Sequence, residues 1–155
     1  MVFARETNTD LASLVKKLDA ETAKNASAKM GSFVVFCNDD EKLEDELKTW
    51  AEKQGIKKTI LAIDNPAGPE KMKVEKDADV TVVLYSKRKV KYNYAYKKGE
   101  LNSKAVDQIA ADIGKMIAEK KAEDEKRAKE EKEELEREKK EREKKEKEKK
   151  DKDKP

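Results

Sequence analysis

The residue best suited to chemistry in this sequence is its single cysteine, Cys37, within the stretch "SFVVFCNDDEKLEDEL" (residues 32–47). A cysteine between a strand and a helix can act as a nucleophile when the helix N-terminus lowers the pKa of its thiol. Here Asp39, Asp40 and Glu41 follow closely, and such acids oppose a neighbouring thiolate. The chain has no histidine to act as a base and no second cysteine to resolve an oxidised sulfur. We therefore expect Cys37 to be a buried strand residue, with a catalytic thiol as the alternative.

Metal and cofactor chemistry has little support in the sequence. Without histidine or a cysteine cluster the usual ligands of zinc and iron are missing, so no cofactor is expected. The acids of residues 39–46 could hold a divalent cation, but they lack the ligand spacing of a calcium loop and fit the charged start of a helix. The loop "DNPAGPE" (residues 64–70) follows a strand, where α/β proteins place ligands, but it has no glycine-rich phosphate motif.

A basic and aromatic stretch, "YSKRKVKYNYAYKK" (residues 85–98), could bind single-stranded nucleic acid through phosphate contacts and stacking. Tyr92, Tyr94 and Tyr96 share one parity, however, so they should face one layer of the domain while the lysines protect an exposed edge strand. We expect a protein partner, with nucleic acid as the alternative. The candidate contact residues for either are Lys87, Arg88, Lys89 and Lys91.

Charge divides the chain into two parts. Charged residues make up 47% of the sequence, far above the usual share of about 25%, and they concentrate in the last part. We expect a domain over residues 1–117 and a Glu/Lys/Arg-rich tail over residues 118–155. No apolar run approaches the length of a membrane helix, which favours a cytoplasmic protein. Because "MVFARE" begins as a strand, the alternative is that residues upstream of Met1 are missing and that the protein is exported.

Hydrophobic patterns predict eight elements in the first part. The "FVVF" run indicates a central strand covered on both faces, and "TILAI" indicates a second buried strand. Asn8 or Thr9 should cap the first helix, Asp39 or Asp40 the second, and Asn102 or Ser103 the third. The predicted elements are a strand at residues 2–4, a helix ending at 24, strands at 33–36 and 59–63 around a helix ending at Gly55, a hairpin of strands 80–85 and 90–96, and a final helix.

This order makes an α/β domain with a mixed sheet flanked by helices, parallel in its first half and antiparallel in the second. The stretch "GPEKMKVEKDADVTVVLYSKRKVKYNYAYKKGELNSKAVDQIAADI" resembles the C-terminal half of thioredoxin-like domains. Together with the "VFARE" start, it is similar to bacterial thioredoxin-like proteins that lack the C-x-x-C motif. The resemblance covers residues 1–117 and implies a thioredoxin-like fold.

The resemblance also implies where thiol chemistry would lie. Redox-active members carry C-x-x-C between a strand and a helix, whereas "FCNDDEKL" keeps one cysteine. They place a cis-proline before the next hydrophobic strand, where this chain has Val80, so that bond should be trans. We expect a catalytically degenerate binding or scaffold module. The alternatives are a thiol oxidoreductase, using Cys37 or a cysteine pair upstream of Met1, and an RNA-binding accessory protein.

The tail predicts a single exposed helix. Acid-to-base pairs four residues apart, such as Glu133–Arg137 and Glu141–Lys145, recur along it. Leu135 is the only sizeable apolar residue after Ile117, so no coiled-coil oligomer is expected. The helix should continue from the last helix of the domain and fray near "KKDKDKP"; a disordered tail is the alternative.

Overall fold

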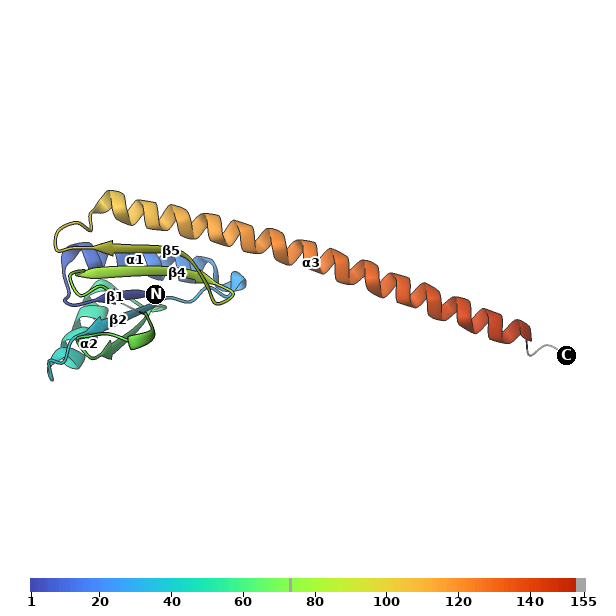
Figure 1. Ribbon diagram of the computed structural model, residues 1–155, viewed down its shortest axis with the longest axis horizontal. Coiled ribbons are helices and arrows are strands. Elements are labelled where there is room, and N and C mark those ends of the chain that lie inside the picture. The colour runs from blue at the N-terminus through green and yellow to red at the C-terminus, as the bar shows by residue number, and fades with distance from the viewer. Residues whose placement is uncertain (73, 153–155) are drawn as a thin grey trace. The chain divides into compact units, whose positions relative to one another are not determined.

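The molecule is described by a computed structural model over residues 1–72 and 74–152, without the side chains of residues 71, 144 and 146–152. The chain divides into two compact units, Met1–Ile117 and Ala118–Pro155. The predicted order of strands and helices is confirmed (Figure 1). The elements are β1 (Val2–Ala4), α1 (Thr9–Lys24), β2 (Phe33–Cys37), α2 (Leu43–Gln54), β3 (Ile60–Asp64), β4 (Val80–Ser86), β5 (Lys89–Tyr96) and α3 (Ser103–Lys152), with short 3-10 turns at Ala26–Ala28 and Glu70–Met72.

The five strands form one mixed sheet in the order β3-β2-β1-β4-β5. β1 pairs in parallel with β2, which pairs in parallel with β3, while β4 is antiparallel to both β1 and β5. The predicted change from parallel to antiparallel pairing is therefore confirmed. The central strand is β1, the shortest of the five, and all three of its residues are buried.

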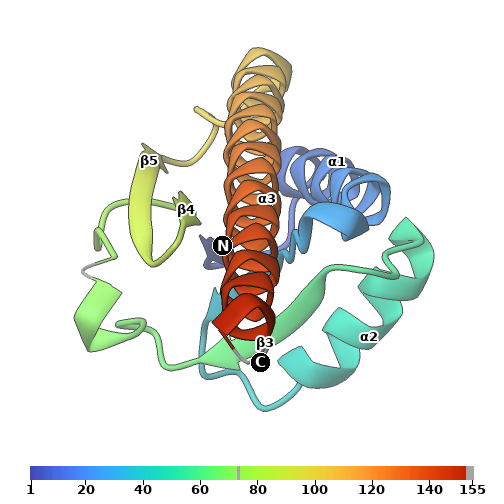
Figure 2. The ribbon, with the colours of Figure 1, turned by 90° about the vertical axis from the view of Figure 1, so that its right-hand side faces the viewer.

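The helices of the domain cover one face of this sheet. The crossovers β1–α1–β2 and β2–α2–β3 step across the sheet in the same direction, and because crossovers are right-handed, their helices lie on the same side. Figure 2 shows α1 and α2 together on one side of the strands. The first turns of α3 join them, since Ile109 packs in the same core as Leu14 and Leu47. The expectation that helices flank the sheet thus holds for one face only.

The second face is covered only at one end. Because β4 is antiparallel to β3, it begins at the end of the sheet where β3 stops, and residues 65–79 join the two without crossing the face. There Val74 packs against a small buried cluster of Phe3, Cys37 and Val83. The described residues of this link give no cover to the amino-terminal halves of β2 and β3.

Two predictions about burial are wrong for this reason. β3 was expected to be buried, but it is an edge strand in which Ile60 is 55% exposed and Ile63 is 44% exposed. β2 was expected to be the central strand with both faces covered. It lies one place from the centre, and its Val34 and Phe36 are fully buried while Val35, on the other face, is half-buried.

The helix starts mostly follow the predicted caps. The Asn8 side chain accepts a hydrogen bond from the Leu11 N–H at 2.8 Å, and Asn102 accepts one from the Ala105 N–H at 3.1 Å. α2 differs, because it begins at Leu43 and the Asp40 side chain instead accepts the Lys42 N–H in the turn before it. The predicted C-terminal glycine, Gly55, has φ 70°, the left-handed conformation that ends α2.

The β4–β5 hairpin packs on α3 through its tyrosines. Tyr92, Tyr94 and Tyr96 share the helix-covered face as predicted, and neighbouring rings stack with centroids 6.2 and 6.3 Å apart. Tyr94 donates to the Asp112 carboxylate at 2.6 Å. Hydrogen bonds from Lys115, Tyr94 and Gln108 lower the pKa of Asp112 to about 2. Val90 has the same parity as the tyrosines in the sequence, but it lies past a bulge in the pairing and is 60% exposed.

The second unit continues α3 as a helix, as predicted. Leu135 is 61% exposed, and the expected pair Glu141–Lys145 is formed at 2.6 Å. Base-first pairs also occur, such as Lys126–Glu130 at 3.8 Å. The expected fraying concerns residues 149–155, of which 149–152 are helical and 153–155 lie outside the described residues.

Asp19 of α1 fixes the start of β3. Its Oδ1 accepts backbone N–H bonds from Lys57, Lys58 and Thr59 at 3.1, 2.6 and 2.7 Å. Burial raises the pKa of Asp19, but the three N–H donors stabilise the carboxylate more, so its pKa falls below the usual 3.8.

We predict that Asp19→Asn lowers the free energy of unfolding by about 1 to 2 kcal/mol at neutral pH, because the N–H groups lose a charged acceptor. A carboxylate with a lowered folded pKa stabilises the fold above pH 3.8, and this contribution is lost as the pH falls through the lowered value. The variant should therefore lose less stability than the native chain between about pH 5 and pH 3. Urea titrations across this pH range measure the free energy of unfolding of both proteins. Glu52→Gln, a similar change on the exposed side of α2, is the control and should change neither quantity; equal behaviour of the two variants would contradict the prediction.

Candidate functional site

Cys37 lies at the end of β2 under the link of residues 65–79. Its side chain is 4% exposed and belongs to the cluster with Phe3 and Val83. Gly68 lies directly over the sulfur, since a Cβ at that position would come within 3.3 Å of the Cys37 Sγ. Burial raises the pKa of the thiol, and Asp64 adds to this while Arg5 acts in the opposite direction. The thiol is thus covered and held in its neutral form.

The turn after β1, rather than the turn after Cys37, lies beside the start of β4. Ala4 pairs with Val80, and the Arg5 N–H donates to the Asp79 carbonyl at 3.2 Å. Cys37 instead pairs with Asp64 of β3. The expected trans bond before Val80 is present, since every described peptide bond is trans. The position opposite Val80 is therefore occupied by β1, a relation that the strand sequences alone do not reveal.

Arg5 holds the link of residues 65–79 against the end of β1. Its guanidinium donates to the carbonyls of Ala78 at 3.0 Å, Pro66 at 2.9 Å and Glu75 at 3.4 Å. These bonds fix the link that covers Cys37. Arg5 is a structural clamp that sequence reasoning did not find, because its partners are backbone carbonyls more than 60 residues away.

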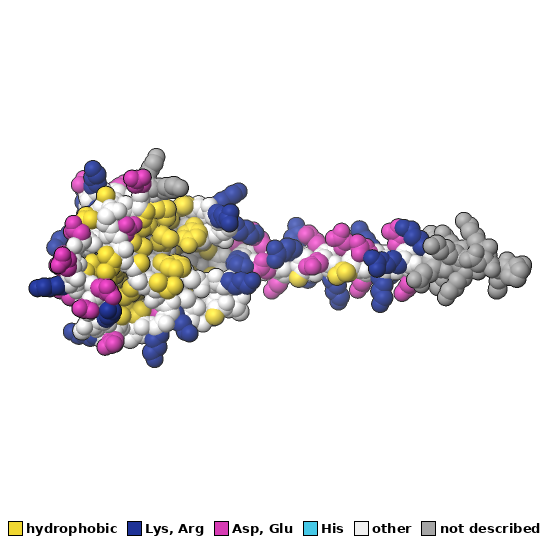
Figure 3. Space-filling model, turned by 90° about the horizontal axis from the view of Figure 1, so that it is seen from below, with side chains coloured by type: hydrophobic (Ala, Val, Ile, Leu, Met, Phe, Trp, Pro, Cys, Tyr) yellow, Lys and Arg dark blue, Asp and Glu magenta, His cyan; other side chains and the backbone are white. Residues whose placement is uncertain are grey.

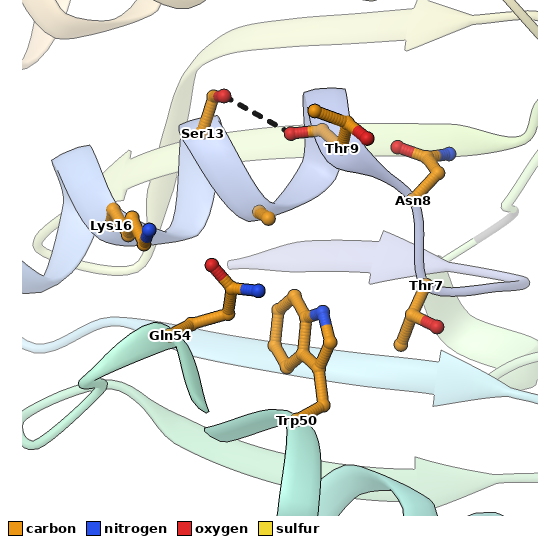
Figure 4. Close-up of a pocket in the computed structure, with 8 residues that line it drawn as sticks. Thr7, Asn8, Thr9, Ser13, Lys16, Trp50 and Gln54 are labelled. Atoms are coloured by element: carbon orange, nitrogen blue, oxygen red, sulfur yellow. Dashed lines mark hydrogen bonds between the residues drawn. The ribbon is translucent and has the colours of Figure 1, made fainter. Parts of the chain in front are cut away.

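A groove of about 320 Å³ lies between α1 and α2 (Figure 4). Trp50 and Gln54 of α2 lie opposite residues of α1 and of the turn before it. The Trp50 ring packs edge-on against Phe36, with ring centroids 6.1 Å apart. Lys16 is the only charged side chain in its lining, so the groove has no pair of titratable groups for acid–base chemistry.

The candidate basic residues gather at the end of the β4–β5 hairpin. Lys87 and Arg88 have φ values of 51° and 63° and form its two-residue turn, and Lys89 and Lys91 follow on β5. All four are exposed. Tyr92, Tyr94 and Tyr96 lie on the helix-covered face, so Tyr85, which is 44% exposed near the end of β4, is the one tyrosine left beside these residues. Over the described side chains, no group of three acids or cysteines is placed to hold a metal ion, the acids of residues 39–46 included.

The surface with the clearest binding character is a strip of apolar side chains on the face of the sheet away from the helices. We call the four residues Phe33, Val35, Ile60 and Ala62 the open strip. Pairing places Phe33 beside Ile60 and Val35 beside Ala62 on neighbouring strands. Ile60 and Ala62 are exposed, and Phe33 and Val35 are half-buried. Figure 3 shows apolar side chains gathered on one face of the Met1–Ile117 unit.

The sequence contains a signal for this strip, the apolar run of β3, but such a run was interpreted as a buried strand. A continuous run such as "ILAI" is apolar on both sides of a strand, which normally indicates burial. Here the run belongs to an edge strand, and its two sides are both partly exposed.

Comparison of the chain with known proteins gives no match to a family model, a curated protein or a solved structure. Over the described residues, no helix is long and apolar enough to cross a membrane.

We predict that the Cys37 thiol of the folded protein reacts at least about a hundredfold more slowly with a disulfide reagent than it does in urea, because it is buried and its pKa is raised. The reaction is measured by absorbance at pH 8. Gly68→Ala is a sharper test: its Cβ would press on the sulfur from 3.3 Å at a position with φ 71°, so the link should loosen and the reaction accelerate. A native thiol as fast as the unfolded one would refute the burial argument.

Proposed function

We propose that this chain is a catalytically degenerate thioredoxin-like domain that serves as a binding module, and that its open strip receives an amphipathic helix of a partner protein. The order of elements and the mixed sheet support the thioredoxin-like assignment. The covered, neutral Cys37 thiol supports the loss of thiol chemistry. The open strip is the observation that carries the binding function.

The open strip is suited to contact with an apolar surface of a partner. Parallel strands in α/β proteins are normally covered on both faces, and here β2 and β3 lack this cover over their amino-terminal halves. Exposed apolar surface of this kind marks interaction sites. Partly exposed isoleucine and phenylalanine side chains give such a site its affinity because binding removes them from water.

The dimensions of the strip fit one helix. Two strands are about 10 Å wide, which equals the diameter of a helix with its side chains. The open strip spans three residues on each strand, about 10 Å, which is the length of about seven helical residues or two turns. A partner sheet or a whole domain would need a broader surface, since stable interfaces bury about 800 Å² on each partner.

The other two functions have less support. Thiol chemistry would require access to Cys37, which Gly68 and Val74 cover. RNA binding by stacking would require several aromatic rings beside the basic residues, and three of the four tyrosines pack in the core on the helix-covered face, which leaves Tyr85. The exposed part of α3, with its alternating charges, suits a spacer or an interaction arm.

A photo-crosslinking residue in place of Ile60 tests the proposal in the host cell. We expect a covalent adduct with one defined partner, because Ile60 is the most exposed member of the open strip. The matched control is the same residue in place of Val90, which has a similar exposure of 60% but lies on the hairpin. Absence of an adduct at Ile60, or the same adduct from both positions, would count against the strip as a binding site. An adduct of twice the mass of the chain, with no other adduct, shows only a second copy beside Ile60 and counts against a partner helix on the strip.

A further inference from the structure

The two edges of the sheet are protected differently. At one edge, β5 carries Lys89 and Lys91 and has a bulge in its pairing with β4, and charges and bulges are the usual means of blocking further strand pairing. At the other edge, β3 has the sequence Ile-Leu-Ala-Ile before Asp64, without a charge, a proline or a bulge. Such an edge is a template for another strand.

The backbone groups that this edge offers follow from its pairing with β2. The Ile60 N–H donates to the Ser32 carbonyl at 3.0 Å, and the Asp64 carbonyl accepts the Asn38 N–H at 3.1 Å. Residues 60, 62 and 64 therefore bond inward to β2. By alternation, Leu61 and Ile63 direct their N–H and C=O groups outward, away from the sheet.

We propose that β3 pairs with β3 of a second copy of this chain, antiparallel and about a two-fold axis, so that two sheets join into one. The register places Ala62 opposite the partner's Ala62. Leu61 then lies opposite the partner's Ile63 as a hydrogen-bonded pair, and the axis repeats this pair once. The outward N–H and C=O groups of Leu61 and Ile63 are then all paired in both copies, which gives four backbone hydrogen bonds between the two strands.

Neighbouring registers leave outward groups unsatisfied. If Leu61 paired with itself, Ile63 would lie opposite the partner's Thr59, whose N–H already donates to Asp19. If Ile63 paired with itself, Leu61 would lie opposite the partner's Asn65, whose N–H already donates to the Asp64 side chain at 2.8 Å. The register centred on Ala62 avoids both conflicts.

The side chains agree with the same register. On the helix-covered face it brings the partly exposed Ile63 against the partner's Leu61, an apolar cross-strand pair that occurs twice. On the other face small alanines meet at the axis. This self-pairing is independent of the partner that the open strip receives.

Cysteine cross-linking tests the register. In a Cys37→Ala background, Ala62→Cys should form an intermolecular disulfide under mild oxidation, because directly opposed residues of a non-hydrogen-bonded pair have Cα atoms about 4.5 Å apart, within disulfide range. Ile60→Cys on the same face is the matched control and should form at least tenfold less dimer, since it lies opposite the partner's Asp64. Equal cross-linking at both positions, or none at Ala62→Cys, would overturn the proposed pairing.

The mass of the full chain in solution, measured by light scattering over a range of concentrations, tests the association itself. We expect a monomer–dimer equilibrium for the native chain. Ile63→Pro removes an outward N–H while leaving the bonds to β2, so dimerisation should weaken at least tenfold. Ile60→Ser changes the open strip but leaves the outward N–H and C=O groups of Leu61 and Ile63 in place, so it should weaken dimerisation far less than Ile63→Pro does. A native chain that stays monomeric up to about 1 mM, the affinity limit of a very weak complex, would refute the proposal. Equal weakening by both variants would do so as well.

Discussion

The handedness of two successive crossovers determines most of what distinguishes this domain. Each of the β1–α1–β2 and β2–α2–β3 units moves one place in the same direction, so both helices must lie on one face. The third parallel strand is thereby carried to the edge of the sheet. The return to β4 then occurs at the end where β3 stops, because β4 runs antiparallel. An uncovered face and an apolar edge are both consequences of this path.

β3 stays in place although it contributes little to the core. Its first half is exposed, and polar bonds at its start replace apolar burial. Asp19 holds three backbone N–H groups there, and a buried chain of hydroxyl groups joins Thr22 to Ser32 and Ser32 to Thr59, at 2.8 Å each. A buried network that is fully satisfied fixes one geometry. The edge and the open strip are therefore held rigid before any partner arrives, which lowers the entropy cost of binding.

Periodicity predicted the elements of this chain because it depends on residues near in sequence. The parity of Tyr92, Tyr94 and Tyr96, the Asn8 cap and the exposed helix around Leu135 are all local properties, and each is confirmed. The strand order is different, since it depends on which strands pair. "FVVF" has the stronger apolar signal, yet the three residues of β1 take the central place because β4 pairs with them.

The candidate site also could not be predicted without knowing which strands and loops come together in the fold. The acids after Cys37 were expected to set its thiol chemistry. The thiol pKa is instead raised mainly by burial under Gly68 and Val74. The charges of Arg5 and Asp64, which lie far away in sequence, have smaller and opposite effects on this pKa. Likewise, nothing local in "TILAI" separates a buried strand from an exposed edge. Only the strand order shows that these residues lie at an exposed edge of the sheet.

The open strip and the sheet edge both include β3, but the strip consists of side chains on one face whereas the edge consists of backbone groups in the plane of the sheet. Side chains of Ile60 and Ala62 point away from the sheet plane, whereas the outward backbone groups of Leu61 and Ile63 lie within it. Occupation of one therefore leaves the other accessible. If two copies pair through β3, their strips become neighbours across the axis, and four strands form a single apolar surface about 19 Å wide. That width accommodates two helices side by side, so self-pairing would convert a site for one partner helix into a site for a helical pair.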